Sequence, residues 1–385
     1  MHALAFIART FASTSLVYYL FATITAIRFA RLARRPPPAL PADIPRVAVL
    51  KPLRGRNQSL PTNLNSHLET DYPSCKFYFA VESTDDPAAE VSVSLQKRHP
   101  SVPVKILTRN HPECENRKVG KLIEMADLAA DADIFVISDA DIAVSREHLR
   151  HIVGELMSDP KIGIVTCTYS ARPIGTFGSR LEALAVNTDF TPQVMLASAI
   201  EPLHYAFGAT IAIKRAALEA MGGFARVKDL LADDFYIGKF VREAGYEVRL
   251  STSIVTTVCE ERTFMDFWRH QLRWARTYRT TRPSSLATIF LHGPFWGLLF
   301  AILTRFSLVG VMTLGAVLAV RIASAAFIMR SVFGLQGEGR DALLTPIKDL
   351  AMTGIWFASL LSNEIEWGGR RLEILPGGAM REVNG

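Results

Sequence analysis

The sequence predicts an α/β domain with a mostly parallel sheet, placed between apolar segments at the two ends of the chain. Short apolar strands and helical stretches alternate from residue 46 to residue 157, which is typical of parallel βαβ units. Hydrophobic residues make up 49% of the 385 positions and concentrate in residues 10–27 and beyond residue 282. With 21% charged residues, this composition excludes an intrinsically disordered chain.

The first apolar segment, residues 10–27, has no formal charge and is long enough to cross a bilayer as a helix. A basic cluster follows it directly, formed by Arg28, Arg31, Arg34 and Arg35. A cleaved signal peptide would carry its basic residues before the apolar run. The observed order favours an uncleaved anchor over residues 1–35 with its downstream side in the cytoplasm. A proline-rich linker follows at residues 36–45.

The central domain is predicted to cover residues 46–282. We expect strands at residues 47–50, 76–81, 102–107 and 134–138, and helices at residues 58–69, 86–98, 116–129 and 145–157. In open sheets of this kind, ligands bind beyond the carboxyl ends of the strands. Functional residues are therefore expected where these strands end.

The C-terminal region, residues 283–385, is predicted to hold membrane segments and a tail. Residues 285–304 are uncharged but interrupted by Gly293-Pro294, and residues 306–329 are apolar except for Arg321. Residues 350–363 are too few to span a bilayer unless residues 345–349 join them, so a re-entrant or interfacial helix is the alternative. The prediction is a multi-pass membrane protein with two or three C-terminal membrane segments.

Acidic residues follow two of the predicted strands. Glu82 and Asp86 come after the second strand, and Asp139 and Asp141 come after the fourth. Carboxylates two residues apart repel each other unless a cation or solvent relieves them, and Mg²⁺ or Mn²⁺ prefers such oxygen ligands together with substrate phosphates. The alternative for Asp139 and Asp141 is a solvated turn. Lys51 ends the first strand, where it either approaches a ligand or only terminates the strand.

Two later segments also carry candidate residues. Asp233-Asp234 begins a helical stretch, where acids could serve chemistry or only favour the helix dipole. Residues 262–282 hold six arginines, and the spacing of His270, Arg273 and Trp274 places several side chains on neighbouring faces of one helix. Arginines there suit bidentate contacts with a diphosphate, or with anionic lipid. Nucleic-acid binding is disfavoured because the net charge is only +6.

Three other residues of the central domain are assigned from local pattern. Lys118 and Lys121 are expected on a solvated helix face, and Gly208 is expected to permit a close backbone approach.

These motifs resemble the membrane-bound inverting glycosyltransferases with a GT-A fold, and more narrowly glycosyltransferase family 21, the ceramide glucosyltransferases and their bacterial relatives. The resemblance covers nearly the whole chain. Its motifs are KPL at 51–53, STDDPA at 83–88, ISDADI at 137–142, ADDFY at 232–236 and HQLRW at 270–274. It implies a GT-A, Rossmann-like catalytic domain.

The resemblance also implies a role for each motif. Asp86 would lie near the base and ribose of a nucleotide sugar, with Lys51, Glu82, Asp139 and Trp274 as further donor contacts. Asp139 and Asp141 would hold the divalent cation, Mg²⁺ or Mn²⁺. Asp234 would be the catalytic base, and Arg273 with His270 would contact the diphosphate or the acceptor. The chain departs from the family pattern at His270, where Gln or Arg is usual, and at Ser83, where relatives often carry Asp.

By resemblance, the expected activity is transfer of a hexose, glucose from UDP-glucose, to the hydroxyl of a membrane lipid, ceramide, giving a β-linked glycolipid. One alternative keeps the enzyme class and changes the reaction to N-acetylglucosamine transfer onto a hopanoid lipid. Another is a non-catalytic, membrane-anchored nucleotide-binding module. The alanine- and arginine-rich composition favours a bacterial inner-membrane protein whose catalytic domain is cytoplasmic.

Overall fold

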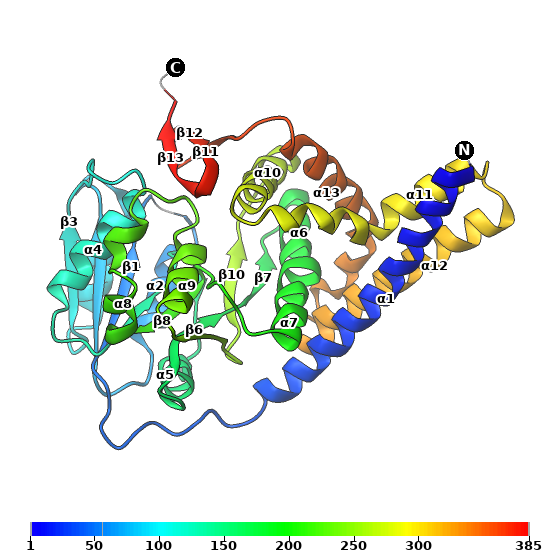
Figure 1. Cartoon of the computed structure of the whole chain (residues 1–385). Coiled ribbons are helices and arrows are strands. Elements are labelled where there is room, and N and C mark those ends of the chain that lie inside the picture. Colours follow the sequence, from blue (N-terminus) through cyan, green and yellow to red (C-terminus); the bar gives the residue numbers. More distant parts are fainter. Residues whose placement is uncertain (1, 56, 384–385) are drawn as a thin grey trace.

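The computed structural model describes residues 2–55 and 57–383 (Figure 1). An α/β domain lies at one end of the molecule and a bundle of long helices at the other. The chain begins in the bundle with α1 (His2–Ala33) and crosses to the α/β domain through an extended linker. It returns to the bundle after α10 (Phe264–Thr281), so the α/β domain lies between the apolar ends, as predicted.

A seven-stranded sheet in the order β3-β2-β1-β4-β8-β6-β9 forms the centre of the α/β domain. The first four strands pair in parallel, and β8 runs antiparallel between β4 and β6. This confirms the predicted mostly parallel sheet and its four strands. The strands are β1 (Val47–Pro52), β2 (Cys75–Val81), β3 (Val104–Thr108), β4 (Ile134–Ile137), β6 (Ile162–Cys167), β8 (Thr210–Lys214) and β9 (Glu247–Leu250).

Helices cover both faces of this sheet, because its central strands are apolar on both sides. Neighbouring residues of β1 illustrate this: Leu50 faces the core formed with α4 and α9, whereas Val49 faces the core formed with α2, α3 and α5. The helices of the domain are α2 (Leu60–Leu68), α3 (Pro87–Arg98), α4 (Arg117–Leu128), α5 (His148–Met157), α8 (Arg215–Ala220), the 3₁₀ helix η2 (Phe224–Val227) and α9 (Asp233–Glu243). Those expected between the first strands are therefore present.

A second, three-stranded sheet lies between the large sheet and the helical bundle. Its order is β5-β10-β7, with β5 (Ile142–Ala143), β7 (Tyr169–Pro173) and β10 (Val255–Cys259). Because β5 starts directly after Asp141, this sheet fixes the chain as it leaves the carboxyl end of β4. The next helices are α6 (Phe177–Ala185), the π-helix η1 (Val186–Phe190) and α7 (Thr191–Ile200).

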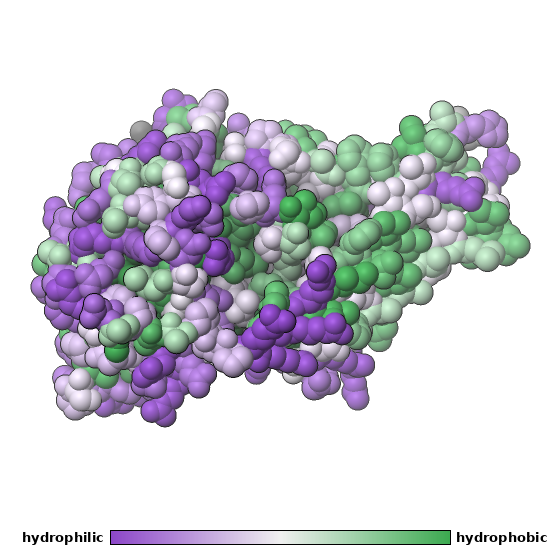
Figure 2. Space-filling model, turned by 60° about the horizontal axis from the view of Figure 1, so that its bottom comes forward, coloured by the Kyte–Doolittle hydropathy of each residue, from purple (hydrophilic) through white to green (hydrophobic). Residues whose placement is uncertain are grey.

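The bundle contains the helices that are apolar enough to cross a membrane. Among the described residues, two helical segments meet that criterion by length and composition, residues 2–33 and 308–332. A third span is possible if η3 (Pro283–Leu291) and α11 (Gly293–Leu303), bent by 54°, act as one. Hydrophobic side chains dominate the surface of this end, and hydrophilic ones that of the α/β domain (Figure 2). The last helices are α12 (Leu308–Phe327), the π-helix η4 (Ile328–Val332), the 3₁₀ helix η5 (Glu338–Leu344) and α13 (Thr345–Ser359).

The C-terminal residues return to the α/β domain as a small sheet that the sequence interpretation did not anticipate. It consists of β11 (Glu364–Trp367), β12 (Arg370–Ile374) and β13 (Met380–Glu382), with the 3₁₀ turn η6 (Pro376–Gly378) between the last two. The glycines at 368 and 369 both have positive φ, as a tight hairpin turn requires. The buried face of this sheet packs on Leu231, close to the start of α9.

Candidate active site

Asp139 stands at the carboxyl end of β4, and a buried lysine fixes its backbone. The Nζ atom of Lys51 donates to the carbonyl oxygen of Asp139 at 2.6 Å and to Oγ of Ser138 at 3.3 Å. Lys51 has no exposed surface, and this burial lowers its pKa to about 7 against the opposing effect of the nearby acids. The structure therefore places Lys51 under the Asp139 turn, where it positions the backbone.

Lys118, at the start of α4, joins two of the predicted acidic motifs. Its Nζ atom lies 2.9 Å from Oδ1 of Asp139 and 3.0 Å from Oδ2 of Asp233. Burial alone would lower the pKa of Lys118, but the carboxylates of Asp139, Asp233 and Asp234 outweigh it and raise the pKa. The expectation that Lys118 lies on a solvated face is wrong, because α4 begins beside the carboxyl ends of the strands.

Asp234 and Asp139 approach each other across the backbone of Gly208. The N–H of Gly208 donates to Oδ2 of Asp234 at 2.8 Å, and the N–H of Phe235 donates to Oδ1 at 2.8 Å. A Cβ atom at residue 208 would lie 2.8 Å from Oδ2 of Asp139 and 3.5 Å from Oδ2 of Asp234, so a larger residue here would displace the Asp139 carboxylate. Burial and the neighbouring Asp233 raise the pKa of Asp234 to about 6, although Lys118 opposes them.

Asp141 completes a carboxylate pair with Asp139. Its Oδ2 atom accepts a hydrogen bond from Oγ1 of Thr257 at 3.2 Å. The surrounding protein partly removes water from Asp141, and this desolvation together with the Asp139 carboxylate raises its pKa. In the described part of the chain no three His, Cys, Asp or Glu side chains form a metal cluster. This pair fits Mg²⁺ or Mn²⁺ only if a substrate supplies further oxygens, which is how these ions bind with phosphates.

The predicted donor contacts of the second strand lie at the same edge of the sheet. Asp86 caps α3, and its Oδ1 atom accepts from the N–H groups of Ala88 at 2.9 Å and Gly55 at 2.8 Å. Glu82 contacts Lys121 at 3.4 Å and Arg117 at 3.3 Å. Burial alone would raise the pKa of Glu82, but these cations outweigh it and lower the pKa.

Lys121 also departs from its expected solvated position. Its side chain is buried, and Nζ donates to the carbonyl oxygen of Leu53 at 2.6 Å. Lys118 and Lys121 are three residues apart, so one face of α4 contacts the ends of β1, β2 and β4. Lys118 and Lys121 therefore hold the loops that follow these strands, although helix periodicity alone predicts both side chains to be exposed.

Helix α10 carries the predicted arginine motif, and its start is capped by Thr263 and Asp266. His270 contacts the buried Glu182 of α6, with 2.7 Å between Nδ1 and Oε1. Gln271 donates to the same oxygen at 2.9 Å. Burial alone would raise the pKa of Glu182, but its contacts with His270 and Arg262 outweigh burial and lower the pKa. His270 is thereby oriented by Glu182, which sequence reasoning missed.

Arg273, the predicted diphosphate contact, forms no ion pair with another described residue. Burial lowers its pKa, and Tyr278 and Glu182 partly offset this effect. Partial burial and the nearby carboxylate of Asp234 raise the pKa of Tyr278. Helix α10 thus carries the half-buried guanidinium of Arg273 and the phenol of Tyr278, and it is Tyr278, which sequence reasoning also missed, that lies near Asp234.

Aromatic rings connect α10 to the Gly208 loop. The ring centroids of Trp274 and Phe190 lie 5.9 Å apart, and those of Phe190 and Phe207 lie 5.4 Å apart. Phe207 directly precedes Gly208. Trp274 also lies 5.0 Å from the ring of His270. The structure thus brings Asp139, Asp141, Asp234 and the α10 motif together, while Asp86 and Glu82 lie along the same sheet edge.

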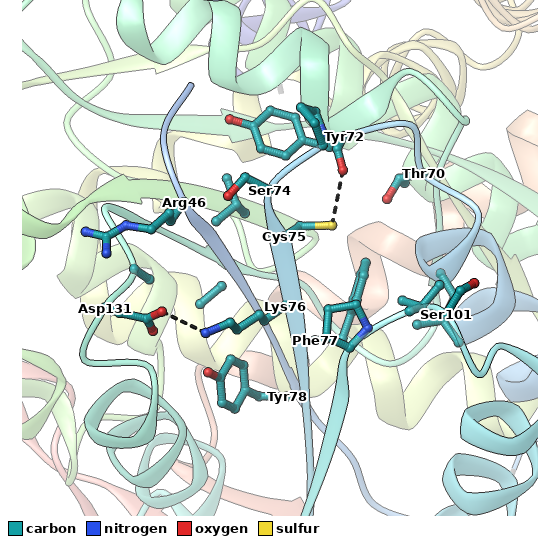
Figure 3. A pocket seen from close by; sticks show the side chains of 17 residues that line it. Arg46, Thr70, Tyr72, Ser74, Cys75, Lys76, Phe77, Tyr78, Ser101 and Asp131 are labelled. Atoms are coloured by element: carbon teal, nitrogen blue, oxygen red, sulfur yellow. Dashed lines mark hydrogen bonds and ion pairs between the residues drawn. The ribbon is translucent and has the colours of Figure 1, made fainter. Parts of the chain in front are cut away.

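A surface pocket of about 340 Å³ lies at the opposite edge of the sheet (Figure 3). It is lined at the amino ends of β1 and β2 by residues such as Arg46, Cys75 and Lys76, and Lys76 forms an exposed ion pair with Asp131 at 2.7 Å. None of the predicted site residues lines it. Because open parallel sheets bind ligands beyond the carboxyl ends of their strands, we assign the chemistry to the acidic edge.

A comparison with known protein families gives a match over nearly the whole chain. The sequence model of glycosyl transferase family 21 matches residues 8–380. The chain belongs to glycosyltransferase family 21. Family membership confirms the resemblance of the motifs, the GT-A type of the α/β fold and the assignment as a glycosyltransferase.

Individual relatives are more distant. The chain is 27% identical over 241 residues to ceramide glucosyltransferase 1 of Caenorhabditis elegans. The aligned residues make up 63% of this chain and 50% of that protein. Ceramide glucosyltransferase 3 of the same organism is 25% identical over 211 residues, 55% of this chain and 46% of the relative. The chain thus spans about half the length of the curated relatives it matches.

Among solved structures, a mannosyltransferase from Pyrobaculum calidifontis in complex with GDP-Man and Mn²⁺ is 19% identical, with a TM-score of 0.49. The match covers 91% of this chain and 99% of that one.

Proposed function

We propose that this family 21 member transfers a hexose to the hydroxyl group of a membrane lipid, with inversion at the anomeric carbon. The proposed hexose is glucose, donated by UDP-glucose, and the proposed lipid is ceramide. The observation that carries the proposal is the convergence of Asp139, Asp234 and Lys118 around Gly208, beside the helical bundle. The ceramide glucosyltransferases among the relatives support the choice of sugar and lipid.

The donor would bind across the acidic edge of the sheet. Asp86 and Glu82 would lie on the nucleoside side, and Trp274 would border the sugar. Asp139 and Asp141 would hold Mg²⁺ or Mn²⁺, which, when bound, neutralises charge on the diphosphate leaving group. Arg273 would contact the same oxygens, because a guanidinium forms paired hydrogen bonds with phosphate.

Asp234 would act as the general base. Its carboxylate would accept the proton of the acceptor hydroxyl while that oxygen forms a bond to the anomeric carbon. The bond from that carbon to the diphosphate oxygen breaks in the same displacement, and its electron pair leaves with UDP. An α-linked donor thereby gives a β-linked glycolipid. One carboxylate facing the acceptor is sufficient, since no covalent sugar–enzyme intermediate is formed.

The position of α10 favours a lipid acceptor over a soluble one. It carries Tyr278, which lies near enough to Asp234 for the carboxylate to raise the pKa of the phenol, and then continues through η3 into the apolar helix α11. A lipid with its chains in the bilayer needs to present only its hydroxyl group to Asp234.

The test is transfer by the full-length protein in lipid nanodiscs, with radiolabelled UDP-glucose or UDP-N-acetylglucosamine and either ceramide or a hopanoid as acceptor. We expect label in the extracted lipid only when UDP-glucose and ceramide are combined. Label transferred from UDP-N-acetylglucosamine to the hopanoid would replace the proposed substrates with the alternative pair. Equally fast transfer to a water-soluble alcohol would contradict a lipid acceptor.

A further inference from the structure

The C-terminal hairpin, formed by β11, β12 and the turn between them, reaches from α10 to the loop that follows β1. Figure 1 shows this part of the chain, in red, between α10 and the large sheet. Ligand sites usually enclose most of a ligand's surface, whereas the carboxyl edge of an open sheet covers one side only. The proposed donor site therefore needs a second wall, and the contacts of the hairpin indicate where it lies.

One end of the hairpin is fixed to α10. Arg276 donates to the carbonyl oxygen of Glu364, and Arg279 donates to the carbonyl oxygen of Ser362 at 3.2 Å. Both arginines belong to the helix that carries Arg273, the proposed diphosphate contact. The hairpin thus begins on the helix that contributes to the diphosphate end of the donor site.

The turn of the hairpin lies against Arg54, in the loop that follows β1. Gly368 and Gly369 both have positive φ, and a Cβ atom on Gly368 would collide with Nη1 of Arg54. The residue after Arg54, Gly55, donates its N–H to Oδ1 of Asp86 at 2.8 Å. Arg54 therefore joins the hairpin turn to the residues proposed for the nucleoside side.

Arg54 is an exposed cation without a paired acid. In the described part of the chain no carboxylate forms an ion pair with it, whereas Arg117 and Lys121 are both paired with Glu82. Burial would raise the pKa of Glu82, but Lys121 and Arg54 contribute to lowering it, so Arg54 lies near this carboxylate. Its guanidinium is thus available to a ligand, and the carbonyl and phosphate oxygens of a nucleoside diphosphate are suitable acceptors.

Arg370, the first residue after the turn, holds the hairpin to the segment before α4. Its Nη1 atom donates to the carbonyl oxygen of Glu115 at 3.0 Å. Its Nη2 atom donates to Oε2 of Glu115 at 2.9 Å and to Oε2 of Glu382 at 2.7 Å. Two residues after Glu115, Arg117 contacts Glu82 at 3.3 Å. Arg370 therefore fixes the hairpin to the same segment that contacts the nucleoside side.

We propose that the β11–β12 hairpin is a wall of the donor site, in which Arg54 binds the nucleoside diphosphate and Arg370 holds the hairpin in place. The inference rests on the proposed function and adds a C-terminal element and two residues to the donor site. Arg54 would contact the nucleotide directly. Arg370 is a positioning residue, because it acts through the hairpin.

The test is direct binding of UDP, and of GDP for comparison, to the full-length protein in nanodiscs with Mg²⁺, measured by calorimetry. Arg54→Met removes the guanidinium and keeps a long side chain, whereas Arg54→Lys keeps the charge. Arg370→Met releases the contacts with Glu115. Arg381→Met is the matched control, because Arg381 lies in the same small sheet and its ion pair with Glu373 is exposed.

We expect Arg54→Met to weaken UDP binding by about tenfold, as the loss of a hydrogen bond from a charged group does, and Arg54→Lys to recover part of the loss. Arg370→Met should weaken binding by about threefold, because the wall is then less well ordered before the nucleotide binds. The donor Michaelis constant should rise in parallel, while that of the acceptor stays within about twofold of the wild type. Arg381→Met should match the wild type.

Hydrogen exchange gives a second readout that a purely structural role would not produce. UDP should slow exchange of residues 364–374 in the wild type, and this protection should be smaller in Arg370→Met. Protection confined to residues 82–86 would contradict a wall formed by the hairpin.

UDP binding as tight as in the wild type by both Arg54→Met and Arg370→Met would overturn the inference, even if the protein transfers sugar. Binding of GDP in place of UDP, weakened by the same variants, would replace the proposed donor and keep the wall. Weakened UDP binding by the variants of a protein that transfers no sugar would refute the proposed function and keep the wall. A wild type that binds neither nucleotide would overturn both proposals.

Discussion

The carboxylate of Asp234 is the single group on which the proposed chemistry depends most directly. It is held by two backbone N–H groups and faces Asp139 across Gly208. We expect Asp234→Asn to lower the rate of transfer by about 10²–10⁴-fold, the usual contribution of a general base. Donor binding should remain within about threefold, since the proposed donor contacts are other residues. Transfer rate and binding of UDP-glucose are measured on the same preparation.

Asp131→Asn is the control for this substitution. Asp131 is an exposed carboxylate at the opposite edge of the sheet, so transfer should be unchanged. Full transfer by Asp234→Asn would show that another group accepts the proton. Absence of transfer by the wild type as well as by the variant, with donor binding retained, would instead favour a non-catalytic binding module.

The raised pKa of Asp234 predicts a pH dependence. A base acts in its deprotonated form, and burial together with Asp233 raises the pKa of this carboxyl group to about 6. We therefore expect kcat/KM to be half-maximal near pH 6, to level off about one pH unit above it, and to fall by about tenfold per pH unit well below it. The measurement is the pH profile of kcat/KM for the acceptor. A profile that stays flat to pH 4.5 would contradict the assignment of Asp234 as the base.

Sequence reasoning located the acids of the site better than the residues that hold them. Asp139 and Asp141 could be predicted because carboxylates directly after an apolar strand must lie at its exit. Lys118 was placed in solvent, because helix periodicity cannot tell which face of α4 turns towards a neighbouring strand end. Glu182 and Tyr278 were missed because their partners are His270, 88 residues away from Glu182, and Asp234 on another helix.

At the scale of elements, the C-terminal sheet β11-β12-β13 holds the segments that carry the site. The N–H of Leu231 donates to Gly378 at 3.0 Å, and the N–H of Met380 donates to Asp229 at 3.0 Å, just before α9. Arg276 of α10 donates to the carbonyl oxygen of Glu364. The sheet thus links α10 to the loop that leads into Asp233-Asp234.

We predict that Leu372→Ala loosens this link. Leu372 is fully buried in the cluster around Leu231, and truncating such a residue costs about 2–5 kcal/mol. Hydrogen exchange should accelerate in residues 364–382 and also in residues 229–231, with a lower kcat for transfer. Leu128→Ala, at an exposed leucine of α4, should change neither. Faster exchange confined to residues 364–382 would show that the sheet does not support the site.

The same sheet marks the limit of sequence reasoning about elements. The first four strands and their helices could be predicted, because each strand is an uninterrupted apolar run between polar turns. The C-terminal strands are short and partly exposed. They follow apolar segments that indicate membrane helices, so the sequence gives no sign of a return to the α/β domain. Their burial comes from contact with Leu231, about 140 residues earlier in the chain, which no local pattern indicates.

At the scale of the whole molecule, a buried charge network joins the bundle to the α/β side. Asp189 of η1 contacts Arg321 of α12 and Lys348 of α13, and Asp349 contacts both cations. Residues 345–349 form the start of α13, so the charged side chains of Lys348 and Asp349 belong to this helix. Removing one partner of a buried pair leaves an uncompensated charge and costs about 3–5 kcal/mol.

This network predicts a strong coupling between Arg321 and Asp349. Arg321→Met alone should lower the unfolding temperature of the protein in nanodiscs, and so should Asp349→Asn. The double variant should lose clearly less than the sum of the two, because it removes one charge of each sign. Arg340→Met, at an exposed arginine, serves as the control. Additive losses in the double variant would contradict a coupled network.

The central claim, inverting transfer to a membrane lipid by Asp234, is tested most directly by the configuration of the product. The full-length wild type and Asp234→Asn would be incubated in nanodiscs with ceramide and UDP-glucose labelled with ¹³C at the anomeric carbon, and the extracted lipid examined by NMR. We predict a β-linked glucosyl lipid from the wild type and none from the variant. An α-linked product, or equal β-linked product from both proteins, would contradict the account.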